Sequence, residues 1–420
     1  MRRTALIHHL TAILNLGLFL LLTGLFFSKV ALSAGMVVLV GCAVVHHCKR
    51  GIRHFELEKP FLVYTSVFLM YLVTGFYSED KQFFTERIRV CLPFLLLPFT
   101  FSLPMLDKEK KSSLWLIYYL LLTSVTAIWS TIGYFLVYDS IGLFTENGTL
   151  LSTPINHVRY SLMVAFAILV GIHLFFNFGF KHRHSKFFIL LLVVFLILFL
   201  HFLAVRSGIV GFYFSMVFIG LREIVARKKI RHTILAASIF AISLTSFRLI
   251  PSFQKKYQVT CQSVSSMLQK QEIENISDNG RMKSIEAGLH VGFSNLWTGV
   301  GVGDVKNEVV KYYKDDSSDW ASRELLPHNQ FVFVFAAVGL PGLFLFTFAV
   351  LYPLFYYRFW RNNLIMGFNL IMLSSFLFDH TLETQIGVGF YLVFQLMLIQ
   401  IAKLGSSEDR TIQLGIQEIV

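Results

Sequence analysis

Arg206, Arg281 and His328 are the residues whose type and position could carry chemistry in this sequence. Arg206 separates two long apolar runs, 187–205 and 208–220, so its charge lies at or within a membrane boundary, where charge is costly and usually functional. Arg281 falls in the first turn of an expected helix, where free backbone N–H groups also attract anions. His328 can accept a proton near neutral pH. Together they suit a reaction that neutralises an anionic leaving group and deprotonates a hydroxyl.

Each of these residues also has a structural interpretation. Arg206 could extend its side chain toward water and anchor a helix end. Arg281 could cap or solvate a surface helix, and His328 could be a satisfied histidine at a helix end. We expect the functional interpretation, in which Arg206 and Arg281 bind an anion and His328 acts as a base.

Motifs of several other chemistries are absent. The sequence contains no GxxxxGK[ST], HExxH, GxSxG or DxD motif and no CxxC pair. Nucleotide hydrolysis, zinc proteolysis and sugar-nucleotide transfer with a metal-held diphosphate therefore lack support. A lipid-linked sugar diphosphate fits better, because two arginines can neutralise its leaving group. The sequence predicts a site with no metal and no cofactor.

Three further residues are candidate substrate contacts. Arg159 opens an apolar run from its outer side and could contact substrate or lipid headgroups. Asn329 follows the candidate base directly. Glu383 shares the last outer turn with Asp379 and His380 and could orient an imidazole or an arginine, or simply be solvated.

The composition indicates which elements must position these residues. The chain has 420 residues, of which 55% are hydrophobic, only 15% are charged and 44 are Phe; its mean hydropathy is +0.63. A soluble chain carries about 25% charged residues, so a soluble enzyme and a disordered chain are both excluded. Four scattered cysteines do not form a disulfide framework. The remaining class is an all-α polytopic membrane protein.

A helix needs about 20 apolar residues to cross a bilayer, and the sequence offers about twelve such segments. Two of them are weak, since 30–47 is rich in Gly and Ala and 90–106 contains three prolines. The expected division is 1–250 with nine spans, a large outer loop 251–327, three spans in 328–404, and a tail 405–420. The twelve predicted segments are 10–28, 30–47, 60–77, 90–106, 114–138, 157–180, 187–205, 207–224, 231–250, 329–355, 363–379 and 386–404.

The net charge of +12 indicates the orientation of the chain, because the basic residues gather on one side of the membrane. With the N-terminus inside, every short inner connection is basic, which predicts that both termini lie in the cytoplasm. The large loop then lies outside. These inner connections are 49–59, 108–111, 181–186, 222–231 and 358–361.

The outer loop contains an expected amphipathic helix lying on the membrane surface or on the bundle. Its apolar residues recur at helical spacing, namely Met282, Ile285, Leu289, Phe293 and Leu296. The glycine alternation at 298–304 is either a turn that ends this helix or a set of backbone N–H groups for phosphate.

Three short motifs resemble the bacterial O-antigen ligase/polymerase superfamily. They are Ala204-Val205-Arg206-Ser207-Gly208, Asn279-Gly280-Arg281 followed by Gly299-Val300-Gly301, and Pro327-His328-Asn329-Gln330-Phe331. The layout of twelve spans with a large loop between the ninth and tenth is also similar. The resemblance implies a membrane glycosyltransferase of the GT-C-like type without a metal. By this resemblance, Arg206 and Arg281 hold the diphosphate of an undecaprenyl-linked glycan, and His328 activates the acceptor.

Several functions stay open at this stage. A ligase would join the glycan to lipid A-core at the periplasmic face of the inner membrane, and we favour it for the single dominant outer loop. A polymerase would join repeat units on another lipid-linked chain. An anion or solute transporter is the rival from another class, although the cytoplasmic half offers no matching polar residues. The expected partners are membrane lipids and these glycans, with no nucleic acid.

Overall fold

The computed structural model describes most of the chain. The described residues are 2–50, 59–101, 109–141, 151–180, 182–227, 276–315, 324–356 and 359–417, with residues 258, 261, 262 and 265. Within these ranges the protein is helical and contains no strand.

Fourteen α-helices lie in the described ranges. They are α1 (Arg2–Phe27), α2 (Lys29–Arg50), α3 (Lys59–Val73), α4 (Lys81–Cys91), α5 (Pro93–Thr100), α6 (Glu109–Ile141), α7 (His157–Asn177), α8 (Arg183–Leu203), α9 (Arg206–Arg222), α12 (Ile276–Ser294), α13 (Val305–Asp315), α14 (Gln330–Tyr356), α15 (Asn363–Phe378) and α16 (Gln385–Gln417). Short 3-10 turns lie at η2 (Thr74–Phe76), η5 (Phe359–Arg361) and η6 (Thr381–Glu383), and a single π turn, η3 (Glu223–Arg227), extends α9.

Nine of the helices in the described ranges are long and apolar enough to cross a membrane. They coincide with nine of the twelve predicted segments, which is consistent with a polytopic membrane protein. The predicted segment 363–379 forms the shorter apolar helix α15, of 16 residues. The predicted segment 231–250 lies outside the described residues. The count of twelve spans therefore stays a prediction.

The predicted segment 90–106 differs from the structure. Its residues belong to two short helices, because α4 ends at Cys91 and α5 begins at Pro93. Proline lacks the N–H that would continue α4 but fits the first turn of a new helix. Asp80 caps the start of α4 by accepting a hydrogen bond from Phe83 N–H. The charged helix α4 is thereby placed beside the turn that carries Glu383.

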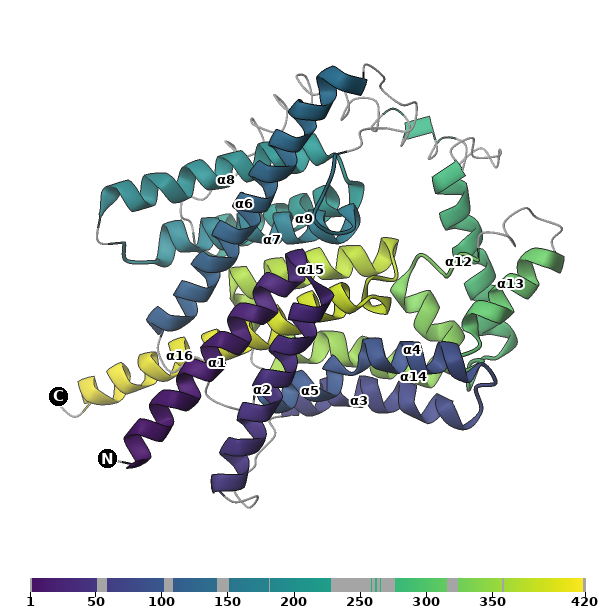
Figure 1. Cartoon of the computed structure of the whole chain (residues 1–420), viewed down its shortest axis with the longest axis horizontal. Helices are drawn as coiled ribbons and strands as arrows, with labels where there is room; N and C mark the ends of the chain where they lie inside the picture. The colour runs from purple at the N-terminus through teal and green to yellow at the C-terminus, as the bar shows by residue number, and fades with distance from the viewer. Residues whose placement is uncertain are drawn as a thin grey trace.

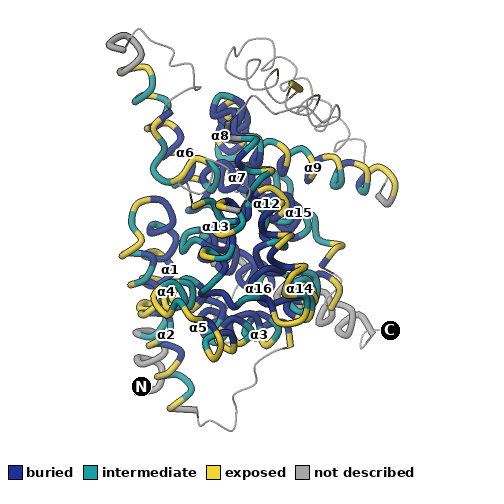
Figure 2. Tube along the Cα trace, turned by 90° about the vertical axis from the view of Figure 1, so that its right-hand side faces the viewer, coloured by how far each residue is buried: buried dark blue, intermediate teal, exposed yellow. Residues whose placement is uncertain are grey.

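The helices form a bundle with one end closed by α12 and α13 (Figure 1). In that view α3 and α14 run alongside one another, and α12 stands across one end of the bundle. The first turn of α1 and the last turn of α16 lie at the opposite end. The most buried segments run through the middle of the bundle, in α7, α15 and α16 (Figure 2).

The expected helix in the large loop is present as α12, but its apolar stripe does not face the bundle. Met282 and Phe293 are exposed, whereas Ser284, Ala287 and Val291 are buried on the opposite side. Small residues on that side let α12 approach α14 closely. At Gly292, for example, an added Cβ would lie 2.4 Å from the Phe335 ring. Close packing through small residues places α12 on the bundle.

The glycine alternation joins the large loop to a break in α14. Gly339 has φ 67° and ψ −168°, and these non-helical angles interrupt α14. The break leaves carbonyl groups of α14 without helical partners, and Val300 N–H and Gly301 N–H donate to two of them. Gly299 is also left-handed, at φ +63°, and an added Cβ there would lie 2.4 Å from α14 backbone.

The same segment is also fixed to the connection between α3 and α4. Val302 N–H donates to Thr74 Oγ1, and Gly303 N–H donates to Ser78 Oγ. The Asp304 carboxylate accepts the N–H groups that precede α4. Because these backbone N–H groups are already used within the protein, the structure favours the turn interpretation over phosphate contact.

Candidate functional site

Helix α12 gathers the candidate residues along its first turns. Asp278, Arg281 and Ser284 are spaced three residues apart on α12. Each either is a candidate site residue or contacts one. Six residues of helix rise about 9 Å, so these three positions lie within the reach of a single diphosphate and its acceptor. Sequence reasoning found Arg281 but missed its two neighbours, although their regular spacing was readable.

Arg206 is attached to this helix by an ion pair. It begins α9 directly after a tight connection in which Ala204 is left-handed, at φ 50°. Its Nη1 lies 2.8 Å from both carboxylate oxygens of Asp278, and about a third of the Arg206 side chain is exposed. The pair engages one guanidinium nitrogen, so the remaining N–H groups can still meet an anion.

Arg281 differs from Arg206 in having no carboxylate partner among the described residues. Its side chain is partly buried, and within the described residues it forms no ion pair and no side-chain hydrogen bond. It lies close enough to His328 to lower the pKa of that imidazole. A partly desolvated cation without a protein partner is suited to bind a phosphate.

His328 contacts α12 through Ser284. The Ser284 hydroxyl lies 3.1 Å from His328 Nδ1 and also accepts the backbone N–H of His328 at 3.1 Å. Burial lowers the pKa of His328 below its usual range; Asp379 acts to raise it, while Arg281 and Arg159 act to lower it. The ring is therefore neutral, and able to accept a proton, at pH values where a free imidazole is partly charged.

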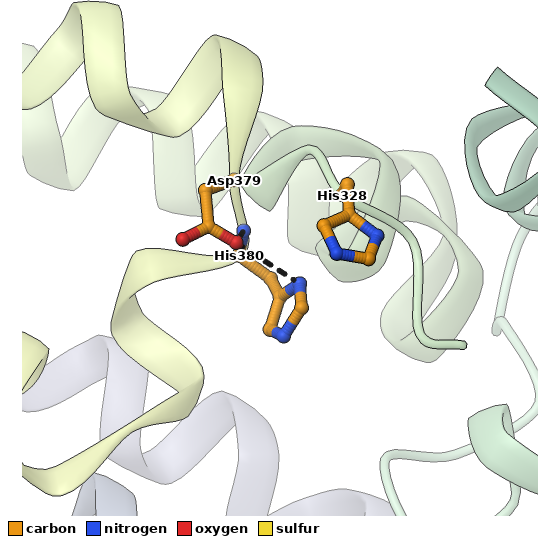
Figure 3. A group of neighbouring side chains, drawn as sticks. All are labelled: His328, Asp379 and His380. Atoms are coloured by element: carbon orange, nitrogen blue, oxygen red, sulfur yellow. Dashed lines mark hydrogen bonds and ion pairs between the residues drawn. The ribbon is translucent and has the colours of Figure 1, made fainter. Parts of the chain in front are cut away.

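Asp379 and His380 lie beside His328, although they are 51 and 52 residues away in the chain (Figure 3). The two rings are 5.1 Å apart and nearly perpendicular, and His380 Nδ1 lies 3.4 Å from Asp379 Oδ1. Arg159, at the start of α7, pairs with the other oxygen of Asp379 at 3.1 Å. Burial lowers the pKa of His380 to about 4.

This group has the spacing of a metal site but not its charge. One ligand atom from each of His328, Asp379 and His380 lies within 4.8 Å of the others. The single carboxylate is already neutralised by Arg159, and Arg281 and Arg87 add positive charge toward the imidazoles. The positive charge around this group suits a bound anion beside imidazoles that can transfer a proton.

Glu383 is buried one turn further along, rather than solvated. Its carboxylate accepts hydrogen bonds from Tyr71 at 3.1 Å and Gln330 at 2.9 Å. Arg87 of α4 donates to the Glu383 carbonyl at 2.9 Å and lies 3.7 Å from its carboxylate. Burial raises the pKa of Glu383, whereas Arg87 acts to lower it. Glu383 thus orients an arginine, one of the roles the sequence left open, and the arginine is one that sequence reasoning had not selected.

Asn329 is engaged in capping α14. Its Oδ1 accepts the backbone N–H groups of Phe331 and Val332, and its Nδ2 donates to the carbonyl of Leu377. The structure places its amide at the junction of α14 and α15, directly after the candidate base.

Residues 191–347 match the model of the O-antigen ligase family. The matched range begins in α8 and ends in α14, so it includes Arg206, the α12 residues and His328. The resemblance to the O-antigen ligase superfamily that the sequence motifs indicate is therefore confirmed. A comparison of the whole sequence with curated proteins finds no match.

Proposed function

We propose that this chain, which carries an O-antigen ligase domain at residues 191–347, transfers a glycan from undecaprenyl diphosphate to lipid A-core. The observation that carries the proposal is the guanidinium of Arg281, which has no ion-pair partner among the described residues, beside the buried imidazole of His328. A cation for the leaving diphosphate and a base for the incoming hydroxyl are the two groups that such a transfer requires.

The reaction follows from the positions of these groups. The diphosphate lies against Arg281 and the free N–H groups of Arg206, which neutralise its charge as the glycosidic bond breaks. The hydroxyl oxygen of the acceptor attacks the anomeric carbon, and its proton passes to His328. The electron pair of the broken bond leaves with the diphosphate.

Asp379 stabilises the charge that His328 acquires. Its carboxylate lies beside both imidazoles, and Arg159 limits how far it raises their pKa values. His328 is therefore basic enough to take the proton but remains neutral before the reaction. No step requires a metal ion, and we expect transfer to continue in the presence of EDTA.

The site lies at the end of the bundle opposite the first turn of α1 and the last turn of α16, which supports a periplasmic position if both termini are cytoplasmic. A polymerase of the same superfamily would use the same donor chemistry with another lipid-linked glycan as acceptor. An anion or solute transporter would not need an imidazole poised beside the bound anion.

Purified protein can test the proposal with an undecaprenyl diphosphate-linked glycan and lipid A-core. Arg281→Ala and Arg206→Ala should each abolish transfer, and His328→Ala should reduce kcat by about 10² or more with little change in donor affinity. Arg89→Ala, at an exposed arginine of α4, is the matched control and should retain activity. Full activity in either arginine variant would remove that residue from the site.

A deletion strain separates ligase from polymerase. Loss of polymer from lipid A with retention of lipid-linked polymer would identify a ligase. Lipid A carrying single repeat units would instead identify a polymerase and replace the acceptor proposed here.

A further inference from the structure

Ser284 forms three polar contacts through one hydroxyl group. Its side chain is fully buried on the face of α12 that packs against α14. The hydroxyl oxygen lies 2.8 Å from the carbonyl of Arg281, 3.1 Å from the backbone nitrogen of His328 and 3.1 Å from His328 Nδ1. The residue therefore joins the candidate cation and the candidate base.

The hydroxyl has one proton, and its partners determine where that proton points. A carbonyl can only accept, so the proton of Ser284 is directed at the carbonyl of Arg281. The hydroxyl oxygen must then accept from both nitrogens of His328 that face it. For the ring, this requires a hydrogen atom on Nδ1.

We propose that Ser284 holds neutral His328 in the tautomer with hydrogen on Nδ1, so that Nε2 carries the lone pair that receives the acceptor's proton. The assignment of Nε2 as the base rests on the proposed function, whereas the tautomer itself does not. Ser284 is thus a positioning residue, since it acts only through His328. Its hydrogen bond to the Arg281 carbonyl also fixes the base relative to the cation that binds the leaving group.

The charged groups around His328 agree with this assignment. Arg281 approaches from α12 and Arg159 from α7, and neither can accept a hydrogen from Nδ1. Asp379 and His380 approach from the turn after α15, where the carboxylate can stabilise the imidazolium once Nε2 has been protonated. The backbone of Leu326 is also hydrogen-bonded to the ring and acts to raise its pKa, and no described side chain is hydrogen-bonded to Nε2.

Nitrogen NMR tests the tautomer without any assumption about activity. Protein labelled with ¹⁵N-histidine would be compared with the His328→Asn variant, at a pH where His328 is neutral, to isolate the His328 signals. We expect a protonated Nδ1 and an unprotonated Nε2. The opposite pattern would overturn the proposal, and this outcome is independent of which reaction the protein catalyses.

Transfer kinetics test the consequence of the tautomer. Ser284→Ala should lower kcat about tenfold, as loss of a supporting hydrogen bond commonly does, with the donor KM changed less than twofold. The acid limb of the pH profile should move to lower pH, because the imidazolium loses an acceptor. Ser284→Thr keeps the oxygen and should restore most of kcat.

A matched control separates this role from packing. Ser124 of α6 is also buried and also bonds a backbone carbonyl of its own helix, that of Leu120. Ser124→Ala should leave both kcat and the pH profile unchanged. Two results would show that the oxygen of Ser284 does not act through the base. One is that Ser284→Ala lowers kcat without moving the acid limb of the pH profile. The other is that Ser284→Thr loses as much kcat as Ser284→Ala.

Discussion

Replacing Arg159 by Gln should raise the pH at which the enzyme loses activity. Arg159 pairs with Asp379 at 3.1 Å, and the side chains of both residues are only about 10% exposed. Removing the guanidinium leaves the Asp379 carboxylate uncompensated beside His328 and His380. An uncompensated anion favours the protonated imidazole, so the pKa of His328 should rise and the base should be lost at higher pH.

The size of the shift follows from the distances in the site. An imidazolium and a carboxylate 4.8 Å apart attract each other by about 3.5 kcal/mol at an effective dielectric constant of 20. Without Arg159, this attraction would favour the protonated form of His328 and raise its pKa. Arg159 cancels only part of it in the native site, and solvent near the pocket screens the rest. We therefore expect the acid limb of kcat to move upward by about one unit.

The measurement is kcat as a function of pH, from about 5 to 9, for the native protein and three variants. Arg159→Gln should lose much more activity at pH 6 than at pH 8, whereas Arg159→Lys should keep the native profile because it keeps the charge. Arg89→Ala removes an exposed arginine of α4 and serves as the control for a change in net charge.

Two results would refute the reasoning. An acid limb that stays in place in Arg159→Gln would show that the Arg159–Asp379 pair does not tune the base. An acid limb that moves to lower pH would show that loss of Arg159 also releases Asp379 from the imidazoles, so that the carboxylate no longer acts on His328.

The remaining predictions concern stability, measured as the thermal unfolding midpoint in detergent. Glu383→Ala leaves Arg87 as a buried cation without its carboxylate and should destabilise the protein by about 3–5 kcal/mol. The loss of stability in Glu383→Gln should be smaller. Equal losses in the two variants would show that the charge of Glu383 is not the cause. Gly299→Ala forces a side chain at φ +63° against the Ala337 backbone and should lower the midpoint by several degrees. Its control, Gly133→Ala in the open middle of α6, should be neutral or slightly stabilising.

Much of the helical framework could be predicted from hydropathy alone. Apolar runs of about 20 residues have few alternatives to a membrane-crossing helix, so nine predicted segments coincide with observed helices. The segment 90–106 is predicted as one weak span that contains three prolines. Pro93 instead starts a new helix, because the preceding segment 81–91 is charged and capped by Asp80.

The placement of α12 shows where a periodicity argument fails. Apolar residues at helical spacing, such as Met282 and Phe293, favour a buried stripe in a soluble protein. In a membrane protein, close contact between helices is provided by small residues instead, and here Ala287 and Gly292 occupy the buried face. The helix could be predicted from the sequence, but its orientation depended on the partner helix α14.

The contacts that complete the site join residues far apart in the chain. Arg206 reaches Asp278, His328 reaches Ser284, and Arg159 reaches Asp379 across 220 residues. Residue type alone identified Arg206, Arg281 and His328, because charge and imidazole are rare beside apolar runs. Their partners are ordinary polar residues whose role becomes visible only when the helices are packed.

The two arginines are unequal, and this bears on the order of events in the site. Arg206 is held by Asp278, so a phosphate that uses it must share the guanidinium with a carboxylate. Arg281 has no such competitor in the part of the chain that the structure describes, so there an anion can bind it without breaking an ion pair. The donor diphosphate should therefore engage Arg281 first, and Arg206 should contribute most as charge develops on the leaving group. Charge that develops late is stabilised by groups already oriented toward it, and Asp278 provides that orientation.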